Sequence, residues 1–171
     1  AASPCEAKRV GSQSPEKDLS MSITLKAERI QLPDSLEEVN QRLYEAGMTD
    51  GLPIIPPTED RVLRMLEGVA LPADFEIALL PPQWATATAE AIAINAVMAG
   101  CRPEHMPVLV TAVEAVACPE FVLLGVLAST GGYAVSIMLN GPIRKEIDLN
   151  CSNNLFGPGK LTNASIGRAL R

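Results

Sequence analysis

Apolar residues recur three or four positions apart in several parts of the chain, which is the spacing of one face of an α-helix. Ser35 with Glu38 three residues later forms a capping-box pattern at the start of one such stretch. Gly47 and Gly68 follow two of the stretches, where a glycine commonly ends a helix. The pattern predicts helices over 35–46, 58–67, from 86 or 88 to 99, and 103–117.

Short, continuously apolar runs predict the strands. Residues 121–127 and 133–139 are each expected to form a buried strand, and 22–25 and 72–80 are expected to be shorter strands or extended connections. Segment 49–58 contains three prolines, which exclude it from the centre of a sheet. The mixture predicts an α/β fold in which a small sheet is packed by several helices.

The first part of the chain, residues 1–20, mixes Ser, Pro, Lys and Glu with few apolar residues. Such a segment cannot offset its ordering entropy by burying surface, so it is expected to be a flexible arm or to wrap around a partner. Residues 21–171 are expected to form a single compact α/β domain, because 47% hydrophobic content supplies enough apolar mass for one core.

Charge, hydropathy and cysteine content exclude some classes of protein. The formal net charge of -6 argues against nucleic-acid binding, which requires clustered Lys and Arg. No run reaches the roughly 18 to 20 apolar residues that a membrane-spanning helix needs. Four cysteines without a CxxC pair are typical of reduced thiols. The sequence therefore predicts a soluble, cytoplasmic protein with no nucleic-acid partner and no membrane partner.

Three glycine-bearing connections are predicted to form one binding site. Two of them, 129–132 and 140–142, follow predicted strands, and loops at strand ends commonly hold ligands in α/β folds. The third, 157–159, leads into a helix expected to begin at Thr162 or Asn163, whose backbone N–H groups attract an anion. The alternative for this turn is an ordinary helix cap. The residues expected to bind a small anionic molecule are Ser129, Thr130, Gly131, Gly132, Asn140, Gly141, Arg144, Gly157, Gly159, Asn163 and Arg168.

Two cysteines are candidate catalytic nucleophiles. Cys101 precedes the predicted helix that begins at Pro103, and the positive end of a helix dipole lowers the pKa of a thiol. Cys151 lies in a polar loop before the glycine turn, where a partly exposed thiol can reach a ligand. The alternative is a structural role as a small apolar side chain, which is the role predicted for Cys118.

His105 is the only histidine, and it lies four residues after Cys101 and next to Glu104. These three side chains are a candidate acid–base or metal constellation. One histidine cannot supply a histidine-rich site, so a zinc ion would need further ligands such as Cys151. Two alternatives therefore stay open: a single metal ion held by Cys101, His105 and Cys151, or an ordinary surface histidine.

Four motifs occur in the same order as in a known group of proteins. They are the segments 50–58 (DGLPIIPPT), 95–104 (NAVMAGCRPE), 140–146 (NGPIRKE) and 157–169 (GPGKLTNASIGRA). From residue 50 onward the chain therefore resembles a microbial family associated with UGSC-type thiol proteins and selenoproteins. Members of that family continue beyond the last of these motifs. The resemblance thus implies that the chain is the N-terminal part of a longer or split protein, with its site completed by a second polypeptide.

Two functions agree with these features. In the first, the chain is a subunit of an enzyme that acts on a small carboxylate-bearing substrate by lyase- or hydrolase-type chemistry. Loop amides with Arg144 or Arg168 would hold the anion. Cys101 or Cys151 would act as nucleophile or metal ligand. In the second, the chain is a non-catalytic scaffold or binding subunit of an oligomeric, heteromeric complex, and its glycines serve close packing.

Overall fold

A computed structural model describes residues 23–171, and the arm predicted over residues 1–20 lies outside them. Within the described part, the chain contains seven α-helices, two short 3-10 helices and one sheet of two strands, so the predicted mixture of helix and strand is confirmed. In chain order the elements are α1 (Leu36–Glu45), α2 (Glu59–Glu67), β1 (Glu76–Leu80), β2 (Ala85–Thr88), α3 (Ala89–Met98), η1 (Pro103–His105), α4 (Met106–Ala117), η2 (Pro119–Phe121), α5 (Leu123–Ala128), α6 (Ile143–Glu146) and α7 (Leu161–Leu170).

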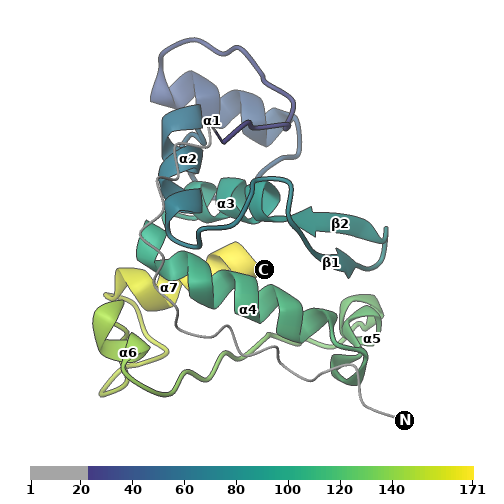
Figure 1. The fold of residues 1–171 in the computed structure, drawn as a ribbon, viewed down its shortest axis with the longest axis vertical. Helices are drawn as coiled ribbons and strands as arrows, with labels where there is room; N and C mark the ends of the chain where they lie inside the picture. Colours follow the sequence, from purple (N-terminus) through teal and green to yellow (C-terminus); the bar gives the residue numbers. More distant parts are fainter. Residues whose placement is uncertain (1–22) are drawn as a thin grey trace.

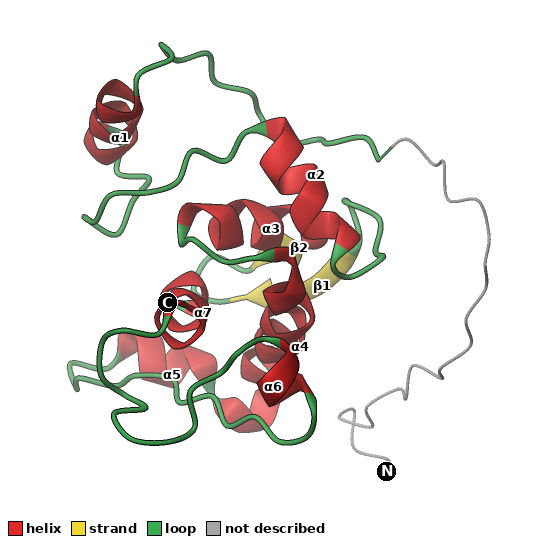
Figure 2. Cartoon of the chain, turned by 90° about the vertical axis from the view of Figure 1, so that its left-hand side faces the viewer, coloured by secondary structure: helices red, strands yellow, loops and turns green. Residues whose placement is uncertain are grey.

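Helix α3 lies at the centre of the molecule and packs against α2, α4 and α7 (Figure 1). Ala93 and Ala96 on α3 are fully buried, and such small side chains let neighbouring helices approach closely. Leu66 of α2 and Leu109 of α4 are also buried in this core. The strands β1 and β2 form a hairpin, and β1 packs on α4. Figure 2 shows α1 standing apart from these elements at one end of the molecule.

The predicted helices α1 to α4 are confirmed, and each begins and ends within three residues of its predicted range. Ser35 caps α1 by accepting the Glu38 N–H at 3.4 Å. Thr88 caps α3 in the same way by accepting the Ala91 N–H at 3.2 Å. Gly47 has a φ of +68° after α1, a left-handed conformation that favours glycine. Capping residues and helical periodicity are local signals, which explains why both were visible in the sequence.

The two strands of the sheet run antiparallel, with Leu80 opposite Ala85 and Glu76 opposite Thr88. The first strand lies within the extended segment predicted over 72–80. The second strand, β2, contains Thr86, which was the earlier of the two predicted starts of α3. Helix α3 therefore begins only after Thr88.

The strands predicted over 121–127 and 133–139 are wrong. The first range forms the end of η2 and most of α5, and the second has no regular secondary structure. Residues 23–25 also form no strand. An apolar run this short fits a helical turn as well as a strand, and periodicity alone does not separate the two. The predicted burial is wrong as well, because no residue of either range is buried. The loop 129–132 and the turn 140–142 therefore do not follow strands, which removes the argument for placing a ligand there.

Polar side chains on helices hold long irregular segments in place by bonding to their backbone. Asn40 on α1 accepts the Ile54 N–H at 2.6 Å and donates to the Ile54 carbonyl at 3.3 Å. Glu90 on α3 is buried and accepts the N–H groups of Lys26 and Ala27, each at 3.0 Å. These side chains satisfy backbone groups that a neighbouring strand would satisfy in a larger sheet.

Helix length also bears on membrane insertion. Among residues 23–171, no single helix is both long and apolar enough to cross a bilayer. One pair of segments, Pro103–Ala117 and Pro119–Ala128, reaches the required length and composition only when taken together, and it is bent by 71° at the break.

Candidate functional site

The three glycine-bearing connections lie at different places in the fold. The loop 129–132 follows α5, the turn 140–142 precedes α6, and the turn 157–159 precedes α7. Figure 1 shows α5 and α6 on opposite sides of the lower half of the molecule. None of the residues in these connections lines either of the two hollows described below. The predicted shared pocket therefore gains no support from the structure.

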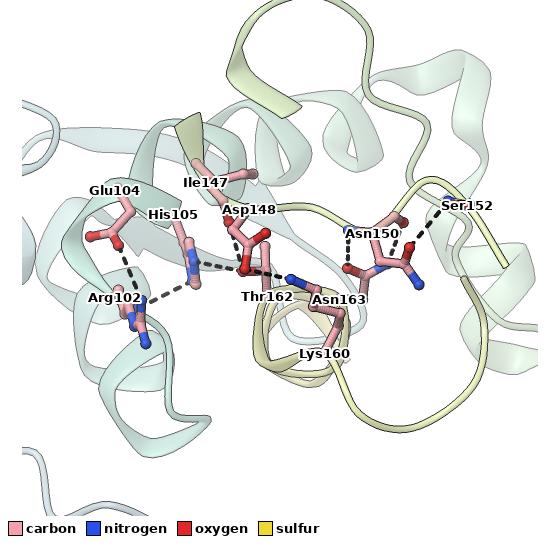
Figure 3. Close-up of polar contacts among 10 residues, drawn as sticks. All are labelled: Arg102, Glu104, His105, Ile147, Asp148, Asn150, Ser152, Lys160, Thr162 and Asn163. Atoms are coloured by element: carbon pink, nitrogen blue, oxygen red, sulfur yellow. Dashed lines mark hydrogen bonds and ion pairs between the residues drawn. The ribbon is translucent and has the colours of Figure 1, made fainter. Parts of the chain in front are cut away.

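The Asn163 side chain, predicted to contact an anion, is bonded to the chain itself. It accepts the Asn150 N–H at 2.9 Å and donates to the Asn150 carbonyl at 3.0 Å (Figure 3). It also donates to the Leu155 carbonyl at 3.2 Å. Both ends of the amide are thus engaged in holding the 150–155 loop against α7, as Asn40 and Glu90 hold other segments.

Arg168, also predicted to contact an anion, forms a bidentate ion pair with Asp50. Its Nε lies 2.7 Å from Oδ2 and its Nη2 lies 2.8 Å from Oδ1. Nη2 also donates to the carbonyls of Leu52 and Pro53 at 3.3 and 3.0 Å. The guanidinium therefore ties the last helix to the 50–53 turn, and its charge is already matched by a carboxylate of the same chain.

This ion pair predicts a specific response to acid. The hydrogen bonds from Arg168 lower the pKa of Asp50 from 3.8 to about 2. Because the folded-state pKa is depressed, the pair stabilises the fold above about pH 4, and this contribution is lost as the pH falls toward about 2. Both side chains are partly exposed, so we expect Asp50→Asn to lower the free energy of unfolding by about 1 kcal/mol at neutral pH. Urea titrations should show this difference vanishing in acid; a difference independent of pH would contradict it.

Four more residues in or beside these connections have a partner or a backbone role within the chain. Arg144 donates from Nε to the Gly141 carbonyl at 3.4 Å, and Lys160 pairs with Asp148 at 2.6 Å. Gly141 and Gly159 have φ values of +95° and +111°, which side-chain-bearing residues rarely adopt. Backbone geometry is thus sufficient to explain why these two positions are glycine.

Cys101 follows Gly100, the left-handed residue after α3, and its N–H donates to the Ala96 carbonyl at 2.8 Å. The thiol is partly buried against the apolar core. Burial raises the pKa of the Cys101 thiol to about 11, and a hydrogen bond with Ser165 opposes this only in part. The thiol pKa is therefore raised and not lowered as predicted, because burial disfavours the charged thiolate.

Cys101 borders a hollow of about 230 Å³ between α2, α3 and the turn that precedes η1. Three arginines line it, Arg61 and Arg64 from α2 and Arg102 from the turn. We call this feature the Cys101 hollow. Its lining residues are Ile55, Arg61, Arg64, Met65, Val97, Cys101, Arg102 and Pro103.

The positive charge of the Cys101 hollow is only weakly neutralised. Arg61 and Arg64 donate to backbone carbonyls at 2.8 and 3.2 Å. Within residues 23–171, neither of them forms an ion pair with a carboxylate. Arg102 has a solvent-exposed pair with Glu104 at 3.9 Å. Three arginines therefore line one small space, and among residues 23–171 only Arg102 has a carboxylate partner.

Sequence reasoning selected none of the three arginines, Arg61, Arg64 and Arg102, as site residues. The spacing of three residues between Arg61 and Arg64 places these two on one helical face, which the sequence does show. Their proximity to Arg102 depends instead on how closely α2 packs against η1. Gly68 permits this approach, because a Cβ there would lie 2.2 Å from the carbonyl oxygen of Pro103. Its φ of -67° is not left-handed, so close packing accounts for this glycine better than helix termination does.

His105 is buried rather than at the surface, with 1% of its area exposed, and it links three segments (Figure 3). Nδ1 accepts the Arg102 N–H at 3.2 Å, and Nε2 lies 3.4 Å from the Thr162 hydroxyl. That hydroxyl donates to the Ile147 carbonyl at 2.7 Å. Burial lowers the pKa of His105, while the nearby charges of Glu104 and Arg102 act in opposite directions. The ring is therefore neutral at neutral pH, and both of its nitrogens have partners.

The predicted metal site gains no support. Among the residues that the structure describes, no three His, Cys, Asp or Glu side chains lie close enough together to hold an ion. Cys151 is exposed in the loop that Asn163 holds. Both ring nitrogens of His105 are hydrogen-bonded, and the Glu104 carboxylate faces Arg102.

A second hollow, of about 420 Å³, runs along α4 and has a mostly apolar lining. The irregular segment 135–139 forms its far wall, which explains why that stretch is so apolar without being a strand. We call it the α4 groove. Its lining residues are Pro107, Val108, Thr111, Ala112, Ala115, Val116, Phe121, Val135, Ser136, Ile137, Met138, Leu139, Ile143 and Leu170.

No protein-family model matches the chain, and no curated protein or solved structure does either. The resemblance to the UGSC-type family therefore stays a prediction.

Proposed function

We propose that the chain binds a small carboxylate-bearing anion in the Cys101 hollow, as a subunit of an enzyme of the lyase or hydrolase type. One observation carries the proposal: Arg61, Arg64 and Arg102 border a single small space, and the first two form no ion pair within residues 23–171. A planar guanidinium fits a carboxylate through two parallel hydrogen bonds. An anion is therefore the ligand that best complements this lining.

The size and polarity of the hollow limit the ligand further. A volume of about 230 Å³ is below the range of drug-sized ligand pockets, so the anion must be small. Met65 and Val97 contribute apolar surface beside the charges, and a less polar surrounding strengthens ionic hydrogen bonds. In an enzyme, the same arginines would stabilise negative charge that develops on the substrate during acyl transfer or elimination.

Cys101 contributes to this site as a neutral thiol. With a pKa of about 11 it is protonated at neutral pH, so it contacts a ligand as an S–H group rather than attacking as a thiolate. His105 is not placed to act as its base, because both ring nitrogens are bonded elsewhere. The proposal accordingly rests on the arginines, and nucleophilic attack by Cys101 is not part of it.

The proposal predicts a large loss of anion affinity when the arginines of α2 are removed. Hydrogen bonds to charged groups contribute about 1.5 to 3 kcal/mol each, so Arg61→Gln with Arg64→Gln is expected to weaken oxalate binding by about 100-fold or more. Isothermal titration calorimetry at low ionic strength measures the effect. Arg42→Gln is the matched control, because Arg42 is an exposed arginine on α1 outside the hollow. If the double variant binds oxalate as tightly as the control, the proposal is wrong.

A different observation favours the alternative of a non-catalytic scaffold subunit. Phe156 is 92% exposed and Met138 is 87% exposed, and the α4 groove adds further apolar surface. Native mass spectrometry of the purified protein and oxalate titration separate the two functions. A chain that forms oligomers and binds no oxalate would be a scaffold.

A further inference from the structure

We infer that His105 is a positioning residue for the Cys101 hollow: its Nδ1 atom holds the backbone of Arg102 so that the Arg102 side chain stays at the rim. This inference rests on the proposed function. His105 does not line the hollow itself, and Arg102 is the lining residue to which its ring is hydrogen-bonded.

The hydrogen bonds around His105 fix the direction of every donor. Because the Arg102 N–H donates to Nδ1, that nitrogen carries no proton. The neutral ring then carries its proton on Nε2, 3.4 Å from the Thr162 hydroxyl oxygen. Thr162 gives its own proton to the Ile147 carbonyl, so its oxygen accepts from Nε2. One chain of donors runs from Arg102 to Ile147 (Figure 3), and only this tautomer completes it.

The same contacts show why Arg102 depends on His105. The His105 N–H donates to the Arg102 carbonyl at 2.9 Å while Nδ1 accepts the Arg102 N–H, so the two residues close a small ring. Pro103, between them, has no N–H to add a further bond. Thr162 on α7 fixes the imidazole from the other side. The position of Arg102 is thus set by a neutral, correctly oriented histidine.

Protonation of His105 breaks one of these bonds. A proton on Nδ1 would face the N–H of Arg102, and the hydrogen bond between them would be lost. The charged groups around the ring are Arg102 and Glu104 on its own turn, Asp148 after α6, and Lys160 before α7. A histidine acting through its charge would strengthen anion binding when protonated, whereas a positioning histidine weakens it. The sign of the pH dependence therefore distinguishes the two roles.

Two substitutions separate the functions of the two ring nitrogens. His105→Asn places an amide oxygen near the position of Nδ1 and keeps an acceptor for Arg102. His105→Gln places its amide near Nε2, so it keeps the contact with Thr162 and loses that acceptor. We expect the Asn variant to bind oxalate within about twofold of wild type and the Gln variant about tenfold more weakly. Because burial lowers the pKa of His105 from its ordinary value of 6.5, wild-type affinity should fall only as the pH drops below about 6.5, and that of the Asn variant should stay constant.

Calorimetry with oxalate on the full chain gives these affinities, and thermal melts at each pH establish that the protein is folded. Equal affinities of the Asn and Gln variants overturn the inference. If the Asn variant does not fold, the wild-type profile decides alone, because affinity that is constant or rises toward acid overturns it. If the wild type does not bind oxalate, the proposed function is wrong as well. If the wild type binds oxalate and the His105 variants bind it equally well, only this inference is wrong.

Discussion

Replacing Gly68 with alanine is expected to lower the free energy of unfolding by about 3 kcal/mol, because the added Cβ meets backbone rather than a flexible side chain. The ideal Cβ position lies 2.2 Å from the carbonyl oxygen of Pro103 and 2.9 Å from its carbonyl carbon. To relieve this overlap, α2 and η1 have to move apart. Helix propensity alone predicts the opposite sign, since alanine is favoured over glycine by about 1 kcal/mol at helical φ and ψ. The clash is the larger effect, and it decides the outcome.

Gly167→Ala is the matched control for this prediction. Gly167 lies inside α7, and a Cβ there would meet no atom within 4 Å. With no clash, propensity dominates, and we expect the free energy of unfolding to rise by about 0.5 to 1 kcal/mol. Urea unfolding of both variants tests the contrast. If Gly68→Ala is as stable as Gly167→Ala, the close packing of α2 on η1 is not what requires glycine at position 68.

Gly68→Ala is also expected to weaken anion binding more than its loss of stability implies. The displaced segment carries Pro103 and adjoins Arg102, and both line the Cys101 hollow together with the arginines of α2. Separating the two walls increases the distance that a small carboxylate has to bridge. Oxalate titration of the folded variant, compared with Gly167→Ala, measures this effect.

The helices were predictable because their signals are local. Helical periodicity and the capping side chains Ser35 and Thr88 act within a few residues, and both caps are formed in the structure. The strands predicted over 121–127 and 133–139 failed for a related reason. An apolar run shows that a segment is adapted to contact apolar surface, but the partner surface decides its conformation. For 135–139 that partner is α4, not another strand.

The sequence identified some residues of the candidate site but not their surroundings. Cys101 and His105 were identified from the sequence, but their properties depend on burial, which raises the pKa of one and lowers that of the other. Asn163 and Arg168 have the chemistry of ligand-binding residues, yet their partners are Asn150 and Asp50 of the same chain. No local pattern reveals such long-range pairing. In a sequence, a polar side chain that bonds to the chain's own backbone or carboxylates cannot be told from one that binds a ligand.

Replacing Thr162 with valine is expected to lower the free energy of unfolding by about 3 kcal/mol, because it leaves two buried polar groups without a partner. Thr162 is 5% exposed, and its hydroxyl joins the Ile147 carbonyl to Nε2 of His105. Valine has nearly the same shape and a similar helix propensity, so packing and α7 itself are little affected. The expected loss comes from unsatisfied hydrogen-bonding groups in the core, where water does not reach them.

Thr162→Ser is the complementary substitution, because it keeps the hydroxyl and removes the methyl group. Loss of one buried methyl costs about 1 kcal/mol, so the serine variant is expected to be the more stable of the two in urea unfolding. A valine variant as stable as the serine variant would mean that the hydroxyl contributes nothing to stability. The hydrogen bond between Nε2 of His105 and Thr162 would then have no support. The opposite result would make Thr162 the point where α7 is joined to both α6 and the turn that carries Arg102. In that case the stability of the last helix and the geometry of the Cys101 hollow depend on the same hydroxyl group.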